Sequence, residues 1–302
     1  LRVSALTAKD KRDALYCIRG EADYIALSFV RTPGDVKALR RHLKRHGSAI
    51  PIIAKIEKPE AIANIRGIME AADGIMVARG DLGVELPTKK VPQIQNRLIQ
   101  IAGYYDKPVI VATQMLESMI EHPQPTRAEV TDVAAACMAG TDAVMLSAET
   151  AAGRYPVEAV TAMDAILREA EAYQFFTNDG RFGRPPPERP NDVLDAMGVA
   201  VAQLSRDLRI RAVFVLTRSG TTARIISSDR PAAPVIALTQ AEESARRTAL
   251  LWGVYPFRVR RDLDMPEFLR QGEVITRHLR MAKAGDYLLM LSGLGVRNAS
   301  TN

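Results

Sequence analysis

The sequence lacks the features that mark several large classes of protein. No apolar run approaches the roughly 20 residues of a transmembrane helix, and residues 1–13 are polar, without the apolar centre of a signal peptide. Only two cysteines are present, Cys17 and Cys137, and their spacing fits neither a disulfide framework nor a metal site. We therefore expect a cytoplasmic protein with reduced thiols and no membrane partner.

Aromatic residues are also few, at 5% of the 302 residues, and the histidines are too scattered for a catalytic triad or a zinc site. The net charge of +6 comes from basic residues spread along the chain. The densest basic group, Arg40, Arg41, Lys44 and Arg45, fits one solvated helix face. Nucleic acid binding would need a basic stripe and, for single strands, aromatic platforms, so we expect no nucleic acid partner. A mild positive charge suits small anionic substrates.

The first half of the chain repeats one unit five times, a short apolar run rich in Val and Ile followed by an amphipathic helix. The runs are Tyr24 to Val30, Pro51 to Ile56, Gly74 to Ala78, Val109 to Ala112 and Ala143 to Leu146. The helical stretches lie near 34–46, 59–71, 90–105, 127–139 and 156–173. Such runs are typical of strands buried on both faces of a parallel sheet. The pattern fits either an open doubly wound sheet or an incomplete (β/α)8 barrel. The sequence has no Gly-x-Gly-x-x-Gly turn after any of these strands, which weakens the case for a doubly wound sheet that binds a dinucleotide.

A proline-rich stretch, 177–191 (TNDGRFGRPPPERPN), ends this pattern and indicates a linker. We therefore expect one domain over 1–176 and another over 192–302. In the second, a helix from Asp192 to Arg206 precedes strands at 212–216, 235–238 and 287–291, with helices near 221–229, 241–251 and 266–283. This pattern predicts a small doubly wound α/β domain.

Polar residues follow each of the five predicted strands of the first domain. They are Ser28 and Arg31, then Lys55 and Glu57, then Arg79, Gly80 and Asp81, then Thr113 and Gln114, and finally Ser147 and Glu149. In parallel α/β folds the carboxyl ends of the strands converge on one rim, where active sites are built. Five successive strand ends with such groups predict an active site at that rim.

Glu57 and Asp81 are the metal ligands that this arrangement predicts. Two carboxylates from adjacent strand ends can bind one Mg²⁺ and leave positions for water and substrate oxygens. Alternation along a strand puts Lys55 on the same side as Glu57, where its ammonium would present a point charge to a phosphoryl group. The alternative is that the acids make surface salt bridges or cap helices, and that the lysine reaches into solvent.

The segment Arg79-Gly80-Asp81-Leu82-Gly83 is rich in glycine and follows a strand. We expect its two glycines to let the backbone turn sharply and approach a ligand closely. The N–H groups of such a turn can hold a carboxylate or phosphate. Thr113 and Gln114 could add hydroxyl and amide hydrogen bonds, or could be ordinary satisfied turn groups.

A second polar loop opens a helix in the second domain. Its residues are Thr217, Arg218, Ser219, Gly220, Thr221 and Thr222. Four hydroxyls and a glycine at a helix N-terminus predict a phosphate cradle, the alternative being an ordinary helix cap by Ser219 or Thr221. The loop Ser292-Gly293-Leu294-Gly295 ends another strand and could face it.

Several of these stretches resemble the pyruvate kinase family. The similar blocks are ALSFVR at 26–31, AKIEKPE at 54–60, GIMVARGDLGVEL at 74–86, VIVATQMLESM at 109–119, PQPTRAEVTDVA at 123–134 and GTDAVMLSAETAAGRYP at 140–156. TRSGTTAR at 217–224 and the closing LSGLGV and STN resemble the regulatory domain of that family. The resemblance implies the last five strands of a (β/α)8 barrel, followed by an effector-binding α/β domain.

The resemblance also implies an activity, the glycolytic transfer of a phosphoryl group from phosphoenolpyruvate to ADP. It implies that Lys55 neutralises the moving group and that Glu57 and Asp81 hold Mg²⁺ or Mn²⁺. It implies that the backbone around Gly80 and Asp81 binds the substrate carboxylate, and that Thr113 lies near the carbon that is protonated. It further implies a homotetramer that takes a sugar-phosphate or nucleotide effector at the 217–222 loop.

The resemblance leaves part of the family's machinery outside this chain. In the family, three barrel strands and a lid domain precede the region that matches, and they carry phosphate-binding groups, most of the K⁺ site and part of the nucleotide pocket. We therefore expect the 302 residues alone to have little or no kinase activity. Two other functions stay open, a Mg²⁺-dependent aldolase-like enzyme acting on pyruvate-type enolates and a non-catalytic phosphosugar-binding module.

Overall fold

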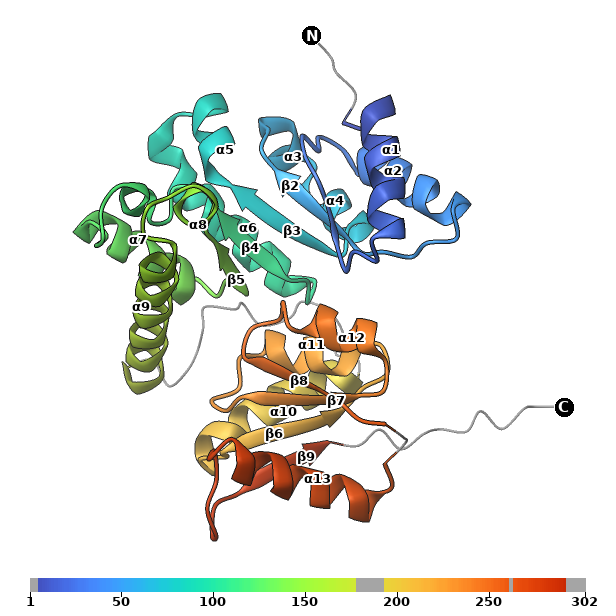
Figure 1. The fold of residues 1–302 in the computed structure, drawn as a ribbon, viewed down its shortest axis with the longest axis vertical. Coiled ribbons are helices and arrows are strands. Elements are labelled where there is room, and N and C mark those ends of the chain that lie inside the picture. Colours follow the sequence, from blue (N-terminus) through green and yellow to red (C-terminus); the bar gives the residue numbers. More distant parts are fainter. Residues whose placement is uncertain (1–4, 178–192, 261–262, 292–302) are drawn as a thin grey trace, which may run out of the picture. The chain divides into compact units, whose positions relative to one another are not determined.

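The structure, a computed structural model, describes residues 5–177, 193–260 and 263–291. The chain divides into two compact units, Leu1–Arg189 and Pro190–Asn302. A five-stranded sheet forms the centre of the first unit and a four-stranded sheet the centre of the second (Figure 1). The predicted linker 177–191 lies outside the described residues apart from its first residue, and so does the loop 292–295.

The strands of the first unit follow one another across the sheet in chain order. They are β1 (Ile25–Leu27), β2 (Ile52–Ile56), β3 (Gly74–Ala78), β4 (Val109–Ala112) and β5 (Ala143–Met145). Every neighbouring pair is parallel. The order β1-β2-β3-β4-β5 has no point at which its direction reverses, whereas a doubly wound sheet has one. This order is that of a segment of a (β/α)8 barrel. The structure therefore excludes the open doubly wound sheet for the first unit and confirms the partial barrel.

Helices precede, separate and follow these strands along the chain. The longer ones are α1 (Ala8–Arg19), α2 (Pro33–Arg45), α4 (Ile65–Ala71), α6 (Val91–Tyr104), α7 (Arg127–Met138) and α9 (Pro156–Thr177). The short ones are α3 (Pro59–Ala63), α5 (Arg79–Glu85), η1 (Thr88–Lys90), η2 (Glu117–Ile120) and α8 (Ala148–Ala151). Proline stands in the first turn of α2, α3 and α6 and at the first residue of α9, where its missing N–H costs nothing.

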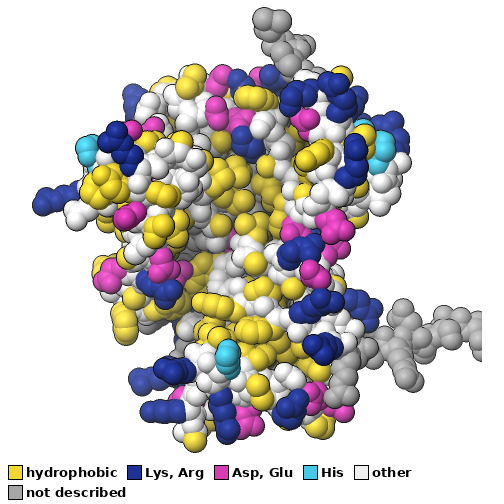
Figure 2. Space-filling view, viewed as in Figure 1, with side chains coloured by type: hydrophobic (Ala, Val, Ile, Leu, Met, Phe, Trp, Pro, Cys, Tyr) yellow, Lys and Arg dark blue, Asp and Glu magenta, His cyan; other side chains and the backbone are white. Residues whose placement is uncertain are grey.

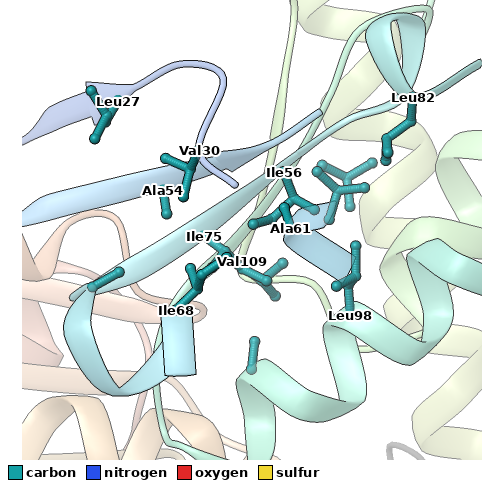
Figure 3. Close-up of a cluster of buried hydrophobic side chains, with 14 of the residues drawn as sticks. Leu27, Val30, Ala54, Ile56, Ala61, Ile68, Ile75, Leu82, Leu98 and Val109 are labelled. Carbon is teal, nitrogen blue, oxygen red and sulfur yellow. The ribbon is translucent and has the colours of Figure 1, made fainter. Parts of the chain in front are cut away.

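The core of the first unit lies between the sheet and these helices. Ala54 and Ile56 of β2 belong to one buried cluster with Ile68 of α4 and Leu98 of α6 (Figure 3). Each fully buried Ile or Leu stabilises the fold by roughly 1.5–3 kcal/mol. Because side chains alternate along a strand, Lys55 lies on the opposite face from Ala54 and Ile56, the face that closes inward in a barrel. The sheet thus separates the packed core from the predicted site.

In the second unit the spatial order of the strands differs from their order in the chain, as is typical of a doubly wound sheet. Its strands are β6 (Ala212–Leu216), β7 (Val235–Thr239), β8 (Val254–Arg258) and β9 (Leu288–Leu291), in the spatial order β8-β7-β6-β9 and all parallel. Its helices are α10 (Val193–Asp207), α11 (Thr221–Ser228), α12 (Glu242–Thr248) and α13 (Met265–His278). The order reverses between β6 and β9, which makes the carboxyl end of β6 the position where such folds bind ligands.

Alternate residues of β6 pack on different helices. Val213 belongs to a cluster that includes Val201 of α10 and Ile226 of α11. Phe214 belongs to a separate cluster that includes Phe268 and Ile275 of α13. Helices therefore cover both faces of this sheet, as the sequence pattern predicts.

The structure corrects several sequence predictions. The predicted helix 59–71 is two helices that meet at Asn64, whose side chain donates to the carbonyls of Glu60 and Arg31. The predicted helix 266–283 ends at His278, because Arg280 has a left-handed φ of 54°. Strand β8 is absent from the sequence prediction because it contains Pro256, which is compatible with its place at the sheet edge.

None of the helices within the described ranges is long and apolar enough to span a bilayer. On the face shown in Figure 2, Lys and Arg side chains are scattered among acidic and neutral ones and do not form a single stripe.

Candidate functional site

Lys55 and Glu57 lie side by side at the carboxyl end of β2. Lys55 Nζ is 2.5 Å from Glu57 Oε1, and the side chains are 25% and 1% exposed, respectively. Strand alternation predicts this proximity, and the structure confirms it. A carboxylate removed from water in this way is stable only with a partner, and the lysine ammonium provides one.

The end of β1 supplies two further contacts to this pair. Lys55 Nζ donates to Ser28 Oγ at 3.0 Å, and the backbone N–H of Phe29 donates to Glu57 Oε2 at 2.7 Å. Phe29 has a φ of 54°, in the left-handed region, which turns its N–H toward the site. The sequence predicts Ser28 as a residue of this rim but gives no signal for the N–H of Phe29.

Asp81 stands at the end of β3, the strand that pairs with β2 in the register Ile56↔Val77. It is exposed, and within the described residues its carboxylate has no hydrogen bond or ion pair. The expected sharp glycine turn at 79–83 is wrong, since Arg79–Glu85 forms a short helix, α5. Neither Gly80 nor Gly83 is among the glycines of positive φ, so these glycines are not required by backbone conformation.

The side chains of Glu57 and Asp81 are chemically suited to a divalent cation that is held by few protein ligands. Glu57 and Asp81 offer carboxylate oxygens, which Mg²⁺ and Mn²⁺ prefer. A carboxylate has about four acceptor positions, and the contacts of Glu57 with Lys55 and Phe29 leave some of these open. In the described part of the chain, no three His, Cys, Asp or Glu side chains gather as in a closed metal site. A cation here would take two protein carboxylates, and water and substrate oxygens would complete its shell.

Thr113 links the ends of β3 and β4. Its Oγ1 accepts the N–H of Gly80 at 2.8 Å and donates to the carbonyl of Ala112 at 2.6 Å. A Cβ added to Gly80 would lie 3.4 Å from Thr113 Oγ1, so the two backbones are in close contact. The structure therefore brings together two of the predicted substrate-binding residues. Gln114 is exposed beside them.

Arg79 is a member of the site whose importance the sequence does not reveal. It is 7% exposed, and its guanidinium contacts the carbonyls of Thr113 and Gln114 and the carboxylate of Asp132 on α7. Asp132 is 53 residues away in the chain, so no local pattern could identify this pairing. The only sequence signal is an arginine directly after a fully buried strand.

Glu149, a residue of the predicted rim, is engaged within the protein. It is 3% exposed, and its carboxylate accepts the N–H groups of Leu116 at 3.2 Å and Ser147 at 2.7 Å. These bonds tie the segment after β4 to the segment after β5. Glu149 thus fixes two neighbouring strand ends relative to each other.

The 217–222 loop lies at the carboxyl end of β6. Thr217 Oγ1 accepts the N–H of Gly220 at 3.0 Å, and the hydroxyls of Ser219 and Thr221 are 3.0 Å apart. Gly220 is the N-cap of α11, with a φ of 84°, and no side chain caps the helix. The alternative of an ordinary cap by Ser219 or Thr221 is therefore wrong, and first-turn N–H groups of α11 remain available for an anion.

Comparison with known proteins agrees with this fold. Residues 1–160 match the family domain described as pyruvate kinase, barrel domain, and residues 195–302 match pyruvate kinase, alpha/beta domain. The pyruvate kinase of Sporosarcina psychrophila is 43% identical, and that of Geobacillus stearothermophilus is 44% identical, each over 100% of this chain and 51% of the relative. The crystal structure of a pyruvate kinase from Cryptosporidium parvum superposes with a TM-score of 0.90 at 34% identity, covering 97% of this chain and 61% of that one.

The chain spans about half the length of the curated relatives that it matches. Both family domains are found in the expected order, and together they cover most of its residues. The chain belongs to the pyruvate kinase family, with part of the barrel domain followed by the α/β domain.

Proposed function

We propose that this chain carries the phosphoryl-transfer centre of an enzyme that converts phosphoenolpyruvate and ADP into pyruvate and ATP in glycolysis. The observation that supports the proposal most strongly is the contact of 2.5 Å between Lys55 Nζ and the buried Glu57 carboxylate at the end of β2. A lysine beside a metal-binding carboxylate is the arrangement that phosphoryl transfer needs, since the protein mainly positions the reactants and stabilises charge.

Lys55 acts in this proposal as the electrostatic partner of the moving phosphoryl group. Its ammonium is held by Glu57 and Ser28, so it is oriented before the substrate arrives. Its side chain keeps 25% of its surface exposed, which leaves it accessible from the rim. The charge on the phosphoryl oxygens is spread during transfer, and a preoriented cation stabilises it without reorganisation of solvent.

Glu57 and Asp81 are the proposed ligands of Mg²⁺ or Mn²⁺. A bound cation would neutralise the charge on the substrate oxygens and hold them in register. Lys55 and the Phe29 N–H keep the Glu57 carboxylate fixed, whereas the exposed Asp81 carboxylate is free to turn toward the ion. We place most of the K⁺ site outside these 302 residues.

The substrate carboxylate is proposed to bind at the backbone of Gly80 and Asp81, in the first turn of α5. The Gly80 N–H already bonds to the Thr113 hydroxyl, so a bound carboxylate would share or replace that bond. Thr113 would then be free to lie beside the carbon that receives a proton when enolpyruvate becomes pyruvate. Its hydroxyl is close enough to the substrate-binding backbone for this role.

The second unit is proposed to bind a sugar phosphate or nucleotide effector at the 217–222 loop and so to regulate the enzyme. The specific observation is the uncapped N-terminus of α11 at the end of β6, where the strand order of the sheet reverses. Arg218 is exposed at this loop, and its guanidinium has no ion pair among the described residues. A cation and free N–H groups in one loop suit a phosphate.

We propose that the complete enzyme is a cytoplasmic homotetramer and that the 302 residues alone turn over little substrate. β1 and β5 are the edges of an open sheet, so the residues that the structure describes do not form one side of the barrel rim. Catalytic groups on the missing side would have to come from elsewhere.

The test is a coupled assay of pyruvate formation by the full-length protein with Lys55→Met and Lys58→Met variants. Lys58 is a matched control, because it lies at the same strand end but pairs with Glu85 on α5. We expect Lys55→Met to lower kcat by on the order of a hundredfold or more, since one preoriented electrostatic group contributes about that much. Equal activities of Lys55→Met and Lys58→Met would show that the proposed role of Lys55 is wrong.

A further inference from the structure

The segment after β4 has a strained backbone. Thr113 and Gln114 have φ values of 71° and 55°, in the left-handed region that residues other than glycine rarely adopt. For a β-branched residue such as threonine this conformation is a genuine outlier. Such residues persist only where the surrounding structure over-determines them, so other groups must hold both residues in place.

The guanidinium of Arg79 makes the contacts that hold this segment. Its Nη2 donates to the carbonyl of Thr113 at 2.7 Å and to the carbonyl of Gln114 at 2.8 Å, while its Nε donates to Thr113 at 3.2 Å. Two consecutive left-handed residues turn their carbonyls toward one cation. Because Arg79 is 7% exposed, these charge-assisted bonds form away from water, where they are stronger.

A second contact fixes the guanidinium from its other side. Arg79 Nη1 donates to Asp132 Oδ2 at 2.5 Å, and Asp132 belongs to α7, the first α-helix after the strained segment. The guanidinium therefore lies between a carboxylate on a helix and two carbonyls in a loop. A planar fork of donors can satisfy these three oxygen acceptors at once, with Met115 Sδ also 2.9 Å from Nη2, whereas a lysine ammonium presents a single point of charge.

The backbone conformation that Arg79 holds also determines where the Thr113 hydroxyl lies. That hydroxyl accepts the N–H of Gly80, the residue that follows Arg79 in the chain. The bonds thus form a closed ring, from Arg79 to the carbonyls of Thr113 and Gln114, and from the Thr113 hydroxyl back to Gly80. Relaxing Thr113 out of its left-handed conformation would move the hydroxyl away from Gly80.

We propose that Arg79 is a positioning residue, whose guanidinium holds Thr113 and Gln114 in the left-handed conformation and so places the Thr113 hydroxyl against the substrate-binding backbone at Gly80. This inference rests on the proposed function, which takes Gly80 and Thr113 as substrate-contacting residues. Arg79 itself faces the carbonyls and Asp132, so it acts through Thr113.

The test measures hydrogen exchange of the Gly80 amide, whose acceptor is the Thr113 hydroxyl. We expect Arg79→Met to raise the exchange rate of this amide about tenfold, the effect of losing one hydrogen bond. A second substitution, Gln114→Gly in the Arg79→Met background, should recover part of the protection, because glycine adopts a left-handed φ without strain. Unchanged exchange at Gly80 in Arg79→Met would overturn the proposal, and so would the absence of any recovery.

Arg40→Met is the matched structural control. Arg40 also pairs with a carboxylate at 2.5 Å, that of Asp73, and donates to the carbonyl of Ala71 at 3.2 Å, but it lies far from Thr113 in the chain and contacts none of its neighbours. Its loss should lower the melting temperature without a selective change at the Gly80 amide. An equal selective rise at Gly80 in Arg40→Met would mean that general destabilisation explains the result.

The kinetic test uses the full-length protein and separates this inference from the proposed function. Arg79→Met should lower kcat more than it raises KM for phosphoenolpyruvate, because the misplaced Thr113 hydroxyl acts in the chemical step. A change in KM alone would contradict the proposal. If the wild-type protein forms no pyruvate, the proposed function fails, while the exchange of the Gly80 amide still decides the positioning role of Arg79.

Discussion

The ammonium of Lys55 and the carboxylate of Glu57 form an ion pair in which one partner is almost completely buried and the other is not. Glu57 is 1% exposed, and Lys55 is 25% exposed. The ionised Glu57 carboxylate therefore needs the ion pair for its stability more than the Lys55 ammonium does, since water can solvate part of the lysine. This asymmetry leads to a prediction about stability that is independent of any catalytic activity.

Lys55→Met should destabilise the first unit, because it leaves the Glu57 carboxylate buried with only the Phe29 N–H as partner. Breaking a fully buried pair costs about 3–5 kcal/mol, and the partial exposure of Lys55 places the expected loss in the free energy of unfolding nearer about 2 kcal/mol. Urea unfolding measures it. The double variant Lys55→Met with Glu57→Gln should be more stable than Lys55→Met alone, and equal or lower stability of the double variant would contradict the pairing.

Binding of Mn²⁺ should depend on both carboxylates of the proposed metal site. Glu57→Gln and Asp81→Asn should each weaken Mn²⁺ binding on the order of tenfold or more, since each removes a charged ligand. Titration followed by electron paramagnetic resonance measures the effect. Glu85→Gln is the control, because Glu85 lies on α5 near Asp81 but pairs with Lys58. An equal loss of affinity in Glu85→Gln would mean that Mn²⁺ responds to the overall negative charge of this region and is not bound specifically by Glu57 and Asp81.

The first unit should lose stability in acid through Glu129. Burial raises the pKa of this carboxyl, but hydrogen bonds from Ser118 and Thr126 outweigh burial, and the net pKa is below its ordinary value of 4.5. A lowered folded pKa means that the stabilisation is present above the unfolded pKa and is lost as the pH falls through the folded pKa. The difference in free energy of unfolding between wild type and Glu129→Gln should therefore shrink as the pH falls below about 4.5.

Urea unfolding between about pH 6 and about pH 3 checks this prediction. Glu273→Gln is a suitable control, because the carboxylate of Glu273 pairs with Arg277 on α13 and both side chains are exposed. A pH-independent difference between wild type and Glu129→Gln would show that the hydrogen bonds from Ser118 and Thr126 do not favour the ionised form.

The 217–222 loop should be destabilised by any side chain at Gly220. Its φ is 84°, and an added Cβ would lie 2.6 Å from Thr248 Cγ2. Gly220→Ala should therefore lower the free energy of unfolding of the second unit by about 1–3 kcal/mol. Thermal unfolding measures this loss, and Gly253→Ala is the control, since Gly253 has a positive φ of 63° but open space around its Cα. Equal losses in the two variants would mean that the steric contact with Thr248 has no effect.

Arg218→Gln should weaken the binding of a sugar bisphosphate to the second unit by about tenfold, the cost of one charge-assisted contact. Isothermal titration calorimetry measures this affinity. Arg258→Gln is the control, because Arg258 is exposed on the same unit and pairs with Glu242. Equal affinities of wild type and Arg218→Gln would remove Arg218 from the proposed effector site.

Much of the sheet could be predicted from the sequence, because strands buried on both faces are continuous runs of Val and Ile. The predicted ranges of β3, β4 and β6 match the structure, whereas that of β1 is too long at both ends and that of β5 includes Leu146 beyond the end of the strand. The strand pattern alone left the barrel and the doubly wound sheet as alternatives, and the family resemblance implied the barrel, which the structure confirms. Only the spatial order of the strands distinguishes them, and this order is set by long-range pairing.

The local part of the site could also be predicted, since Lys55 and Glu57 meet through strand alternation alone. The contacts that orient the site could not. The pairing of Arg79 with Asp132 and the bond from the Phe29 N–H to Glu57 depend on how separate segments pack. The glycines at 79–83 were misleading, because two glycines after a strand are typical of a turn, whereas tertiary contacts here hold a helix.

The most direct test of the central claim is a crystal structure of the full-length protein with Mn²⁺ and a phosphoenolpyruvate analogue, in which the anomalous signal locates the ion. We predict a single peak about 2 Å from carboxylate oxygens of both Glu57 and Asp81, with the Lys55 ammonium facing the phosphate group of the analogue. A peak that contacts only one of these carboxylates, or a Lys55 side chain directed away from the phosphate, would contradict the account.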